Sequence, residues 1–228
     1  MFKKPRVLFK TEFQNPIFVL GSRRSGTHLV GYALGGYLSI RATIEKNPMF
    51  RWVLTMALNP GTRKKLFPRL IRQYKYEMMR SVPRRYLDKS HPNLWLAEDL
   101  HKTFPNAQFV GIERDPFATI ASMMKHKGGA RWHKRWRKYP IPNQFLGITQ
   151  EIAAGYEQLP FVSQGALRWL AHHRQMSYLQ TALGDKLAVL KYESFVQDTE
   201  KELSGLRHFL RLEDAIPVPD VKKEPLMK

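Results

Sequence analysis

The chain of 228 residues contains no cysteine. This absence excludes a disulfide framework, a thiolate metal site and a cysteine nucleophile, and the histidine spacings that indicate a metal site are missing too. No apolar run approaches the roughly 18 residues of a membrane-spanning helix. The basic first residues lack the long apolar stretch of a secretory signal peptide. We therefore expect a cytoplasmic protein with no transmembrane helix, no signal peptide and no bound metal.

Acidic residues are scarce as well. The chain has 19 Asp and Glu against 38 Lys and Arg, which gives a net charge of +19. This balance attracts polyanions, so it suits a nucleotide with several negative charges, a nucleic acid or the surface of an anionic membrane. The length and the 43% hydrophobic content predict one globular domain over residues 1–228. The sequence does not indicate an oligomeric state.

The first informative motif is PIFVLGSRRSGTHL, at residues 16–29. An apolar strand there runs into a polar loop between Gly21 and Gly26, and a helix follows. Such loops bind phosphate because several backbone N–H groups and the positive end of the helix converge on one point. The glycines have the spacing of a nucleotide-binding P-loop, but Thr27 stands where the P-loop has its lysine. The motif predicts an anion site and argues against an ordinary ATPase or kinase; a turn without a ligand is the alternative.

The second motif is AQFVGIERDPFATIAS, at residues 107–122. A short buried strand ends just before Arg114, and Asp115 followed by Pro116 suits the start of a helix. Ser122 lies about two turns into that helix. Arg114 and Ser122 can therefore face one anion.

Strand and helix signals alternate along most of the chain. The expected strands are residues 17–20, 42–45, 86–89, 108–112 and 186–191. The expected helices are residues 27–38, 93–103, 117–127, 163–183 and 200–210, with a further helical excursion over residues 48–85. This alternation predicts an α/β fold with a mostly parallel central sheet flanked by helices. Ligands of such sheets bind beyond the carboxyl ends of the strands, where both motifs and Lys89 fall.

Residues 125–150 fit the alternation poorly, because they are rich in basic and aromatic residues and contain no acid. One interpretation is a packed surface excursion. The other is a flap over an acceptor site, in which Trp132 and Trp136 share a helix face and stack on sugars. Basic residues among aromatics also suit single-stranded nucleic acid. We rank nucleic acid lower because the two motifs already account for a basic cleft.

The motifs SRRSGT and RDP-x5-S, with Lys89 in DKSHP between them, resemble the sulfotransferases that use 3′-phosphoadenosine 5′-phosphosulfate (PAPS). The resemblance extends from about residue 16 to residue 212. It implies a P-loop-like three-layer fold and a metal-independent, in-line transfer of a sulfuryl group to a hydroxyl, or less readily to an amine. The acceptor would be a glycan, a glycolipid or a small molecule, including anionic ones, and the product would be 3′-phosphoadenosine 5′-phosphate (PAP). The chain looks most like the soluble, bacterial-type members.

The resemblance also implies roles for single residues. Arg24 is assigned to the leaving phosphate and the transferring group, and Lys89 to the sulfuryl group and the bridging oxygen. The expected nucleotide-binding residues are Arg23, Arg24, Ser25, Gly26, Thr27, His28, Arg114, Ser122 and Tyr192. Among them, Arg114 and Ser122 are assigned to the 3′-phosphate. His28 stands where many members have a hydroxyl.

Two residues are candidates for the general base that takes the acceptor proton. His91 follows Lys89 as in small-molecule members of the family, and an unperturbed imidazole titrates near neutrality. Glu45 stands where carbohydrate and tyrosyl-protein members have a catalytic glutamate, which needs burial or a neighbour to raise its pKa. The expected catalytic set is therefore His91, Glu45, Lys89 and Arg24. Two other functions stay open: a P-loop-type phosphotransferase or NTPase, and a non-catalytic binder of polyanions or nucleic acid.

Overall fold

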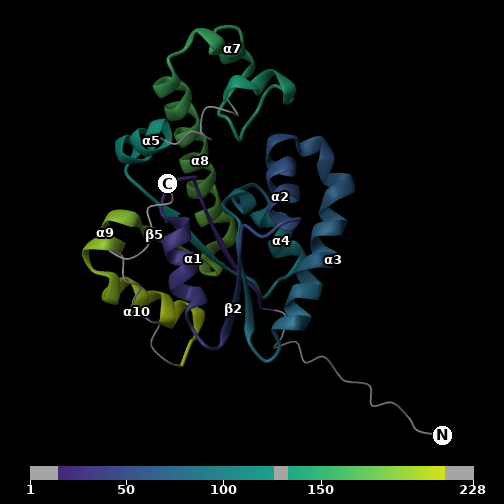
Figure 1. The fold of residues 1–228 in the computed structure, drawn as a ribbon, viewed down its shortest axis with the longest axis vertical. Coiled ribbons are helices and arrows are strands. Elements are labelled where there is room, and N and C mark those ends of the chain that lie inside the picture. Colours follow the sequence, from purple (N-terminus) through teal and green to yellow (C-terminus); the bar gives the residue numbers. More distant parts are fainter. Residues whose placement is uncertain (1–14, 126–132, 214–228) are drawn as a thin grey trace, which may run out of the picture.

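A computed structural model of the protein describes residues 15–125 and 133–213. Its centre is a five-stranded sheet in the order β2-β3-β1-β4-β5, with every neighbouring pair parallel (Figure 1). The strands are β1 (Ile17–Gly21), β2 (Ile40–Ile44), β3 (Arg85–Lys89), β4 (Gln108–Glu113) and β5 (Leu187–Lys191). Each predicted strand is confirmed, with ends that differ by at most two residues.

Helices connect successive strands, and two further helices come after the last strand in the chain. They are α1 (Thr27–Gly35), α2 (Met49–Leu58), α3 (Arg63–Ser81), α4 (Ala97–Thr103), α5 (Pro116–Lys125), α7 (Gln150–Ala153), α8 (Phe161–Leu183), α9 (Tyr192–Gln197) and α10 (Thr199–Leu210). The predicted excursion over residues 48–85 is confirmed as the pair α2 and α3. The sequence did not predict α9.

One predicted helix begins later than expected. Residues 93–103 were expected to be helical throughout, but α4 begins only at Ala97 because His91–Trp95 forms a 3-10 helix. The side chain of Asn93 explains the difference, since its Nδ2 donates to the buried carboxylate of Asp88 at 2.9 Å. Asp88 lies five residues before Asn93, and the same Nδ2 also donates to the hydroxyl of Tyr74 in α3 at 3.0 Å, so both contacts fit a tighter turn than an α-helix would have.

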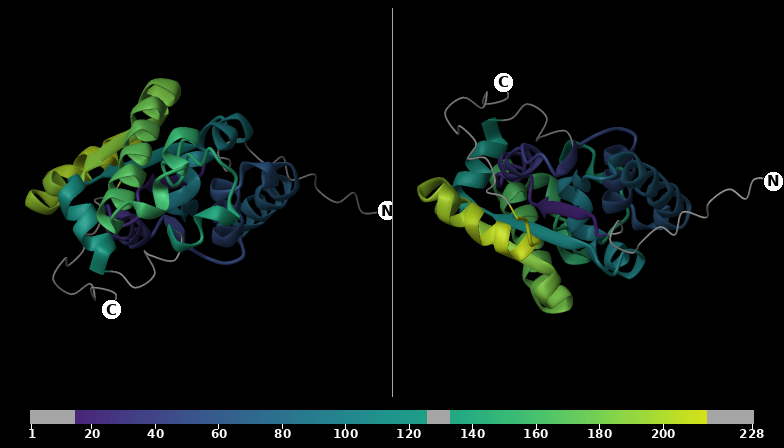
Figure 2. Two further views of the ribbon diagram at one scale, coloured as in Figure 1. Left: turned by 90° about the horizontal axis from the view of Figure 1, so that it is seen from above. Right: turned by 90° about the horizontal axis from the view of Figure 1, so that it is seen from below.

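The helices cover both faces of the sheet, which gives three layers (Figures 1 and 2). All five residues of β1 are buried. Phe18 and Leu20 pack in a cluster with α2, α3, α4 and α8, whereas Ile17 and Val19 pack in a second cluster with α1, α9 and α10. Strands covered on both faces read as continuous apolar runs, which is why the sequence showed no alternation there. The predicted α/β fold is confirmed.

Residues 133–160 form a packed excursion with its own hydrophobic cluster. Trp136, Phe145 and Tyr156 are buried there against the end of α2 and against Leu167 of α8. The ring of Trp136 is therefore not presented for stacking on a sugar, and Trp132 lies outside the described residues. Within the part of the chain that the structure describes, no helix combines the length and apolar character needed to cross a membrane.

The strand order reverses at β1, whose carboxyl end leads into the loop before α1. The chain passes from β1 outward to β2 and β3 on one side, then to β4 and β5 on the other. Ligands of doubly wound sheets bind at such a reversal. Helix α1 crosses β3 so closely that a Cβ added at Gly31 would lie 2.9 Å from Cγ of Lys89. The loop after β1 is thereby placed between Lys89 and the residues that follow β4.

Candidate active site

The loop between β1 and α1 is a cradle of backbone groups. Its turn is closed by Ser25, whose Oγ donates to the carbonyl of Ser22 at 2.7 Å. Gly26 precedes α1 with a φ of 99°, and a Cβ there would lie 2.5 Å from Cδ2 of Tyr192. The first turn of α1 contains no acid, and no side chain caps its N-terminus. Its N–H groups and the positive end of the helix dipole therefore suit an anion.

The first and second motifs meet beside this loop. Arg24 has a φ of 71°, and its Nε donates to Oγ of Ser122 at 2.9 Å. Arg114 donates through Nη1 to the carbonyl of Arg24 at 3.3 Å, and its Cζ lies 4.3 Å from the ring centre of Tyr192. The Nε of Arg114 is buried and has no hydrogen-bond partner among residues 15–125 and 133–213. A buried donor in a cationic group favours an anionic ligand at this position.

Helix α8 adds residues that the sequence did not assign to the site. The indole Nε1 of Trp169 donates to the carbonyl of Arg114 at 3.2 Å. The guanidinium of Arg168 lies 4.6 Å from the ring centre of Phe145, and Nε2 of His172 lies 3.1 Å from the Phe145 carbonyl. Arg168 and His172 are four residues apart, a spacing that places both on one helix face. That spacing was the available signal, but a solvated face has the same pattern.

A second group of side chains lies at the ends of β2 and β3. Oε1 of Glu45 accepts from Nζ of Lys89 at 2.5 Å and lies 2.9 Å from Nδ1 of His91. Nζ of Lys89 also lies 2.9 Å from Nδ1 of His28. His28 belongs to the first turn of α1, so this group adjoins the anion cradle. The structure thus brings together both predicted candidates for the base and the predicted lysine.

Burial controls the protonation of this cluster. Burial lowers the pKa of His91 to about 4, although the Glu45 carboxylate opposes the shift. Burial and then the charge of Lys89 lower the pKa of His28 to about 4. Burial also lowers the pKa of Lys89, against the pull of Glu45. For Glu45 itself, burial favours the neutral acid, but the bonds from His91 and Lys89 outweigh it and lower the pKa.

The tautomer of His91 follows from its contact with Glu45. A carboxylate can only accept, so Nδ1 of the neutral imidazole must carry the proton that it donates to Oε1. The other nitrogen, Nε2, is buried and has no hydrogen-bond partner in the part of the chain that the structure describes. It therefore holds an unused lone pair. Glu45 fixes the imidazole in the orientation that a catalytic dyad uses.

Comparison with known proteins finds similar sequences and similar folds. A sequence model described as "Sulfotransferase family" matches residues 16–215. A protein from Caenorhabditis briggsae named "Putative protein-tyrosine sulfotransferase" is 25% identical over 218 residues, which cover 89% of this chain and 68% of that protein.

Solved structures share the fold. The sulfotransferase domain from the curacin biosynthetic pathway superposes with a TM-score of 0.59 and 18% identity, covering 88% of this chain and 75% of that one. A sulfotransferase from Alicyclobacillus acidocaldarius gives 0.56 and 16%, covering 92% and 87%. Mouse sulfotransferase SULT7A1, solved with PAP, gives 0.50 and 17%, covering 92% and 62%.

Proposed function

The chain belongs to the sulfotransferase family, and from this premise we propose that it transfers a sulfuryl group from PAPS to an acceptor hydroxyl and releases PAP. The observation that carries the proposal is the contact between the two halves of the site. His28, in the first turn after the anion cradle, lies 2.9 Å from Nζ of Lys89, which in turn pairs with Glu45. The anion cradle and the cluster of Glu45, Lys89 and His91 are therefore in direct contact.

The residues present fit the nucleotide. The loop N–H groups of Ser25, Gly26 and Thr27 and the positive end of α1 would bind the 5′-phosphosulfate. Arg114 and Ser122 would bind the 3′-phosphate, because the buried Nε of Arg114 has no partner within the described residues. Arg24 would bridge the two ends of the nucleotide, since its backbone belongs to the loop and its side chain reaches Ser122.

Tyr192 and Arg23 complete the proposed nucleotide site. The ring of Tyr192 stacks against the guanidinium of Arg114 and limits the space beside Gly26. It would border the adenosine next to the 3′-phosphate. Arg23 lies in the loop itself, and the charge of Glu45 acts on it. It would add positive charge where the phosphosulfate binds.

The transfer itself would depend on positioning and on cationic groups. The acceptor oxygen forms a new S–O bond while the S–O bond to the 5′-phosphate oxygen breaks, and negative charge builds on that leaving oxygen. Lys89 is placed to stabilise this charge, because its ammonium group lies beside the first turn of α1. A buried cation acts strongly here, since the site around it has a low effective dielectric constant.

We propose His91 as the base and Glu45 as the residue that orients it. The lone pair on Nε2 of His91 is available at neutral pH because the imidazole is uncharged. It would accept the proton of the acceptor hydroxyl, and the Glu45 carboxylate on Nδ1 would stabilise the resulting imidazolium. Glu45 is less suited to accept the proton alone, since its pKa is lowered and both Lys89 and His91 already bond to it.

The proposed acceptor is a hydroxyl of a glycan, a glycolipid or a small molecule. The name of the Caenorhabditis briggsae relative adds a phenolic hydroxyl of a tyrosyl peptide to the classes to be screened. The net charge of +19 would favour an acceptor with negative charge.

Calorimetric titration with PAP tests the proposal, with ATP and Mg²⁺ as the comparison at one ionic strength. We expect PAP to bind tightly without metal and ATP to bind weakly. A preference for ATP with Mg²⁺, or no binding of either, would refute the sulfotransferase assignment. Binding of PAP that is as salt-sensitive and unspecific as binding of heparin would favour a non-catalytic polyanion binder instead. A screen of acceptors with radiolabelled PAPS follows a positive result.

A further inference from the structure

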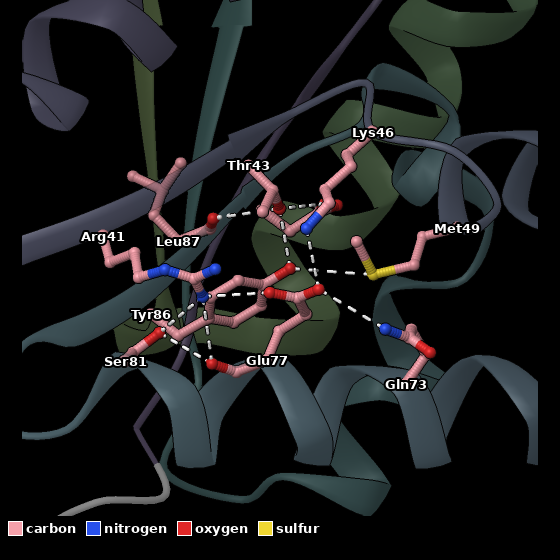
Figure 3. A network of polar contacts seen from close by, with 10 residues as sticks. Arg41, Thr43, Lys46, Met49, Gln73, Glu77, Ser81, Tyr86 and Leu87 are labelled. Carbon is pink, nitrogen blue, oxygen red and sulfur yellow. Dashed lines mark hydrogen bonds and ion pairs between the residues drawn. The ribbon is translucent and has the colours of Figure 1, made fainter.

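The transfer chemistry does not use Glu77, a buried acid near the C-terminal end of α3. Its side chain is 2% exposed, yet both of its carboxylate oxygens are engaged (Figure 3). Oε2 accepts from Nη1 of Arg41 at 2.9 Å, and Oε1 accepts from Nζ of Lys46 at 2.9 Å. Burying a carboxylate is costly unless cations and hydrogen bonds compensate for it. Both cations at Glu77 come from one segment, β2 and the turn that follows it, and Gln73 of α3 adds a bond to Oε1 at 3.4 Å.

Lys46 directly follows Glu45 in this turn. Glu45 has a φ of 46°, in the left-handed region that a non-glycine residue avoids. Such a conformation is unfavourable and persists only where the surroundings fix it. On one side, the N–H of Glu45 donates to the carbonyl of Lys89 at 2.8 Å. On the other side, the Lys46 side chain reaches across to Glu77.

We propose that Glu77 is a positioning residue for the transfer site. Through Lys46 it holds the turn after β2, so that the Glu45 carboxylate stays on Lys89 and on Nδ1 of His91. The importance of this contact for catalysis rests on the proposed function. The geometric statement, that Glu77 controls the Glu45–His91 contact, does not.

A purely structural role for Glu77 makes a different prediction. In that case the acid only neutralises Arg41 and ties α3 to the edge strand β2, with help from Ser81, whose Oγ lies 3.3 Å from Arg41 Nη1. Arg41 and Lys46 would then be equivalent partners of one buried charge. Removing either would lower stability and leave the contact between Glu45 and His91 unchanged.

Two matched substitutions separate the two roles. Lys46→Met removes the link to the turn but leaves Arg41 on Glu77, and Arg41→Met does the reverse. Each removes one cation from the same carboxylate and adds a methionine. The Lys46 side chain is 45% exposed, so its replacement leaves the core intact. Lys46→Arg keeps the charge and the reach, and it serves as the rescue.

The measurement is the ¹⁵N spectrum of the histidine side chains in the ligand-free full-length protein, with His91→Gln to assign the His91 signals. In the wild type we expect a protonated Nδ1 and an unprotonated Nε2 for His91. Lys46→Met should mix the two tautomers, whereas Arg41→Met and Lys46→Arg should keep the wild-type pattern. Thermal unfolding and PAP titration of every variant confirm that each is folded.

The outcomes decide the matter in both directions. A tautomer change in Lys46→Met alone supports the positioning role. An unchanged spectrum in Lys46→Met overturns it, and so does an equal change in Arg41→Met. None of these readouts needs PAPS turnover or a known acceptor. Failure of the proposed function would appear separately, as a wild-type protein that does not bind PAP.

Discussion

Replacing Glu45 with glutamine should lower the stability of the ligand-free protein and increase its affinity for PAP. In the structure the Glu45 carboxylate is the counter-ion of Lys89, whose side chain is fully buried. Removing one partner of a fully buried ion pair costs about 3–5 kcal/mol. Glu45 is 24% exposed, so water replaces part of the lost interaction, and we expect a loss of about 2 kcal/mol. For a chain of this size that loss lowers the melting temperature by about 6 °C.

Nucleotide should reverse this loss. A phosphate group in the cradle would take over the role of counter-ion to Lys89, and Glu45→Gln removes a negative charge that repels it. We expect PAP to bind about tenfold more tightly, which corresponds to about 1.4 kcal/mol, and PAP should restore most of the melting temperature. Turnover should nevertheless fall, because an amide cannot stabilise the imidazolium of His91.

Thermal unfolding with and without PAP, together with calorimetric titration, measures both effects. Glu98→Gln is the matched control, because Glu98 lies in the first turn of α4, outside the proposed site. Weaker PAP binding by Glu45→Gln would show that Glu45 supports the nucleotide rather than competing with it. An unchanged melting temperature would show that Lys89 does not need this counter-ion.

Three further predictions concern the same site. On acidification from neutral pH, the rate of transfer should stay constant until His91 gains its proton near its pKa of about 4. On the alkaline side, the rate should fall at a lower pH than an ordinary lysine would require, because the pKa of Lys89 is lowered. An acid limb centred near the usual pKa of histidine would contradict this. Arg114→Ala should weaken the binding of PAP about 10- to 100-fold, which is the contribution of a charge-assisted contact, and should weaken the binding of adenosine 5′-phosphate much less. Arg84→Ala is the control, because it removes the same charge elsewhere. Equal losses for both nucleotides would show that Arg114 does not bind the 3′-phosphate. Gly26→Ala should abolish PAP binding in calorimetry, because its Cβ would lie 2.5 Å from Cδ2 of Tyr192. Adding Tyr192→Ala to this variant should restore part of the binding. No recovery would mean that backbone strain alone causes the loss.

Local patterns predicted most of the fold. The central strands β1 and β4 were marked by apolar runs because they are covered on both faces. The spacing of Gly21 and Gly26 indicated the loop, since only a few backbone shapes join a strand to a helix there. Helix α9 was missed because its residues 192–197 are too few to show a helical period. The 3-10 helix at His91–Trp95 coincides with bonds from Asn93 to Asp88 and to Tyr74, and local spacing does not encode the contact with Tyr74 of α3.

The site could be predicted in part. The sequence named Glu45 and His91 as alternatives, because each matches a different branch of the family. The structure makes them partners, through a contact between residues 46 positions apart. No periodicity connects these two positions, so only the parallel pairing of β2 with β3 could bring them together. Arg168 was missed because its helical spacing from His172 also occurs on many solvent-exposed helix faces.

Gly31 has a consequence for how sequences of this kind are compared. A methyl group at this position would meet Cγ of Lys89 at 2.9 Å, near the rigid base of that side chain. The sequence signature of the anion loop therefore extends one helical turn past Thr27, to a residue that packs against Lys89. Among relatives, a larger residue at this position should occur together with a replaced or shifted strand lysine. Such paired variation would separate chains that have only the loop from chains that can also place the lysine.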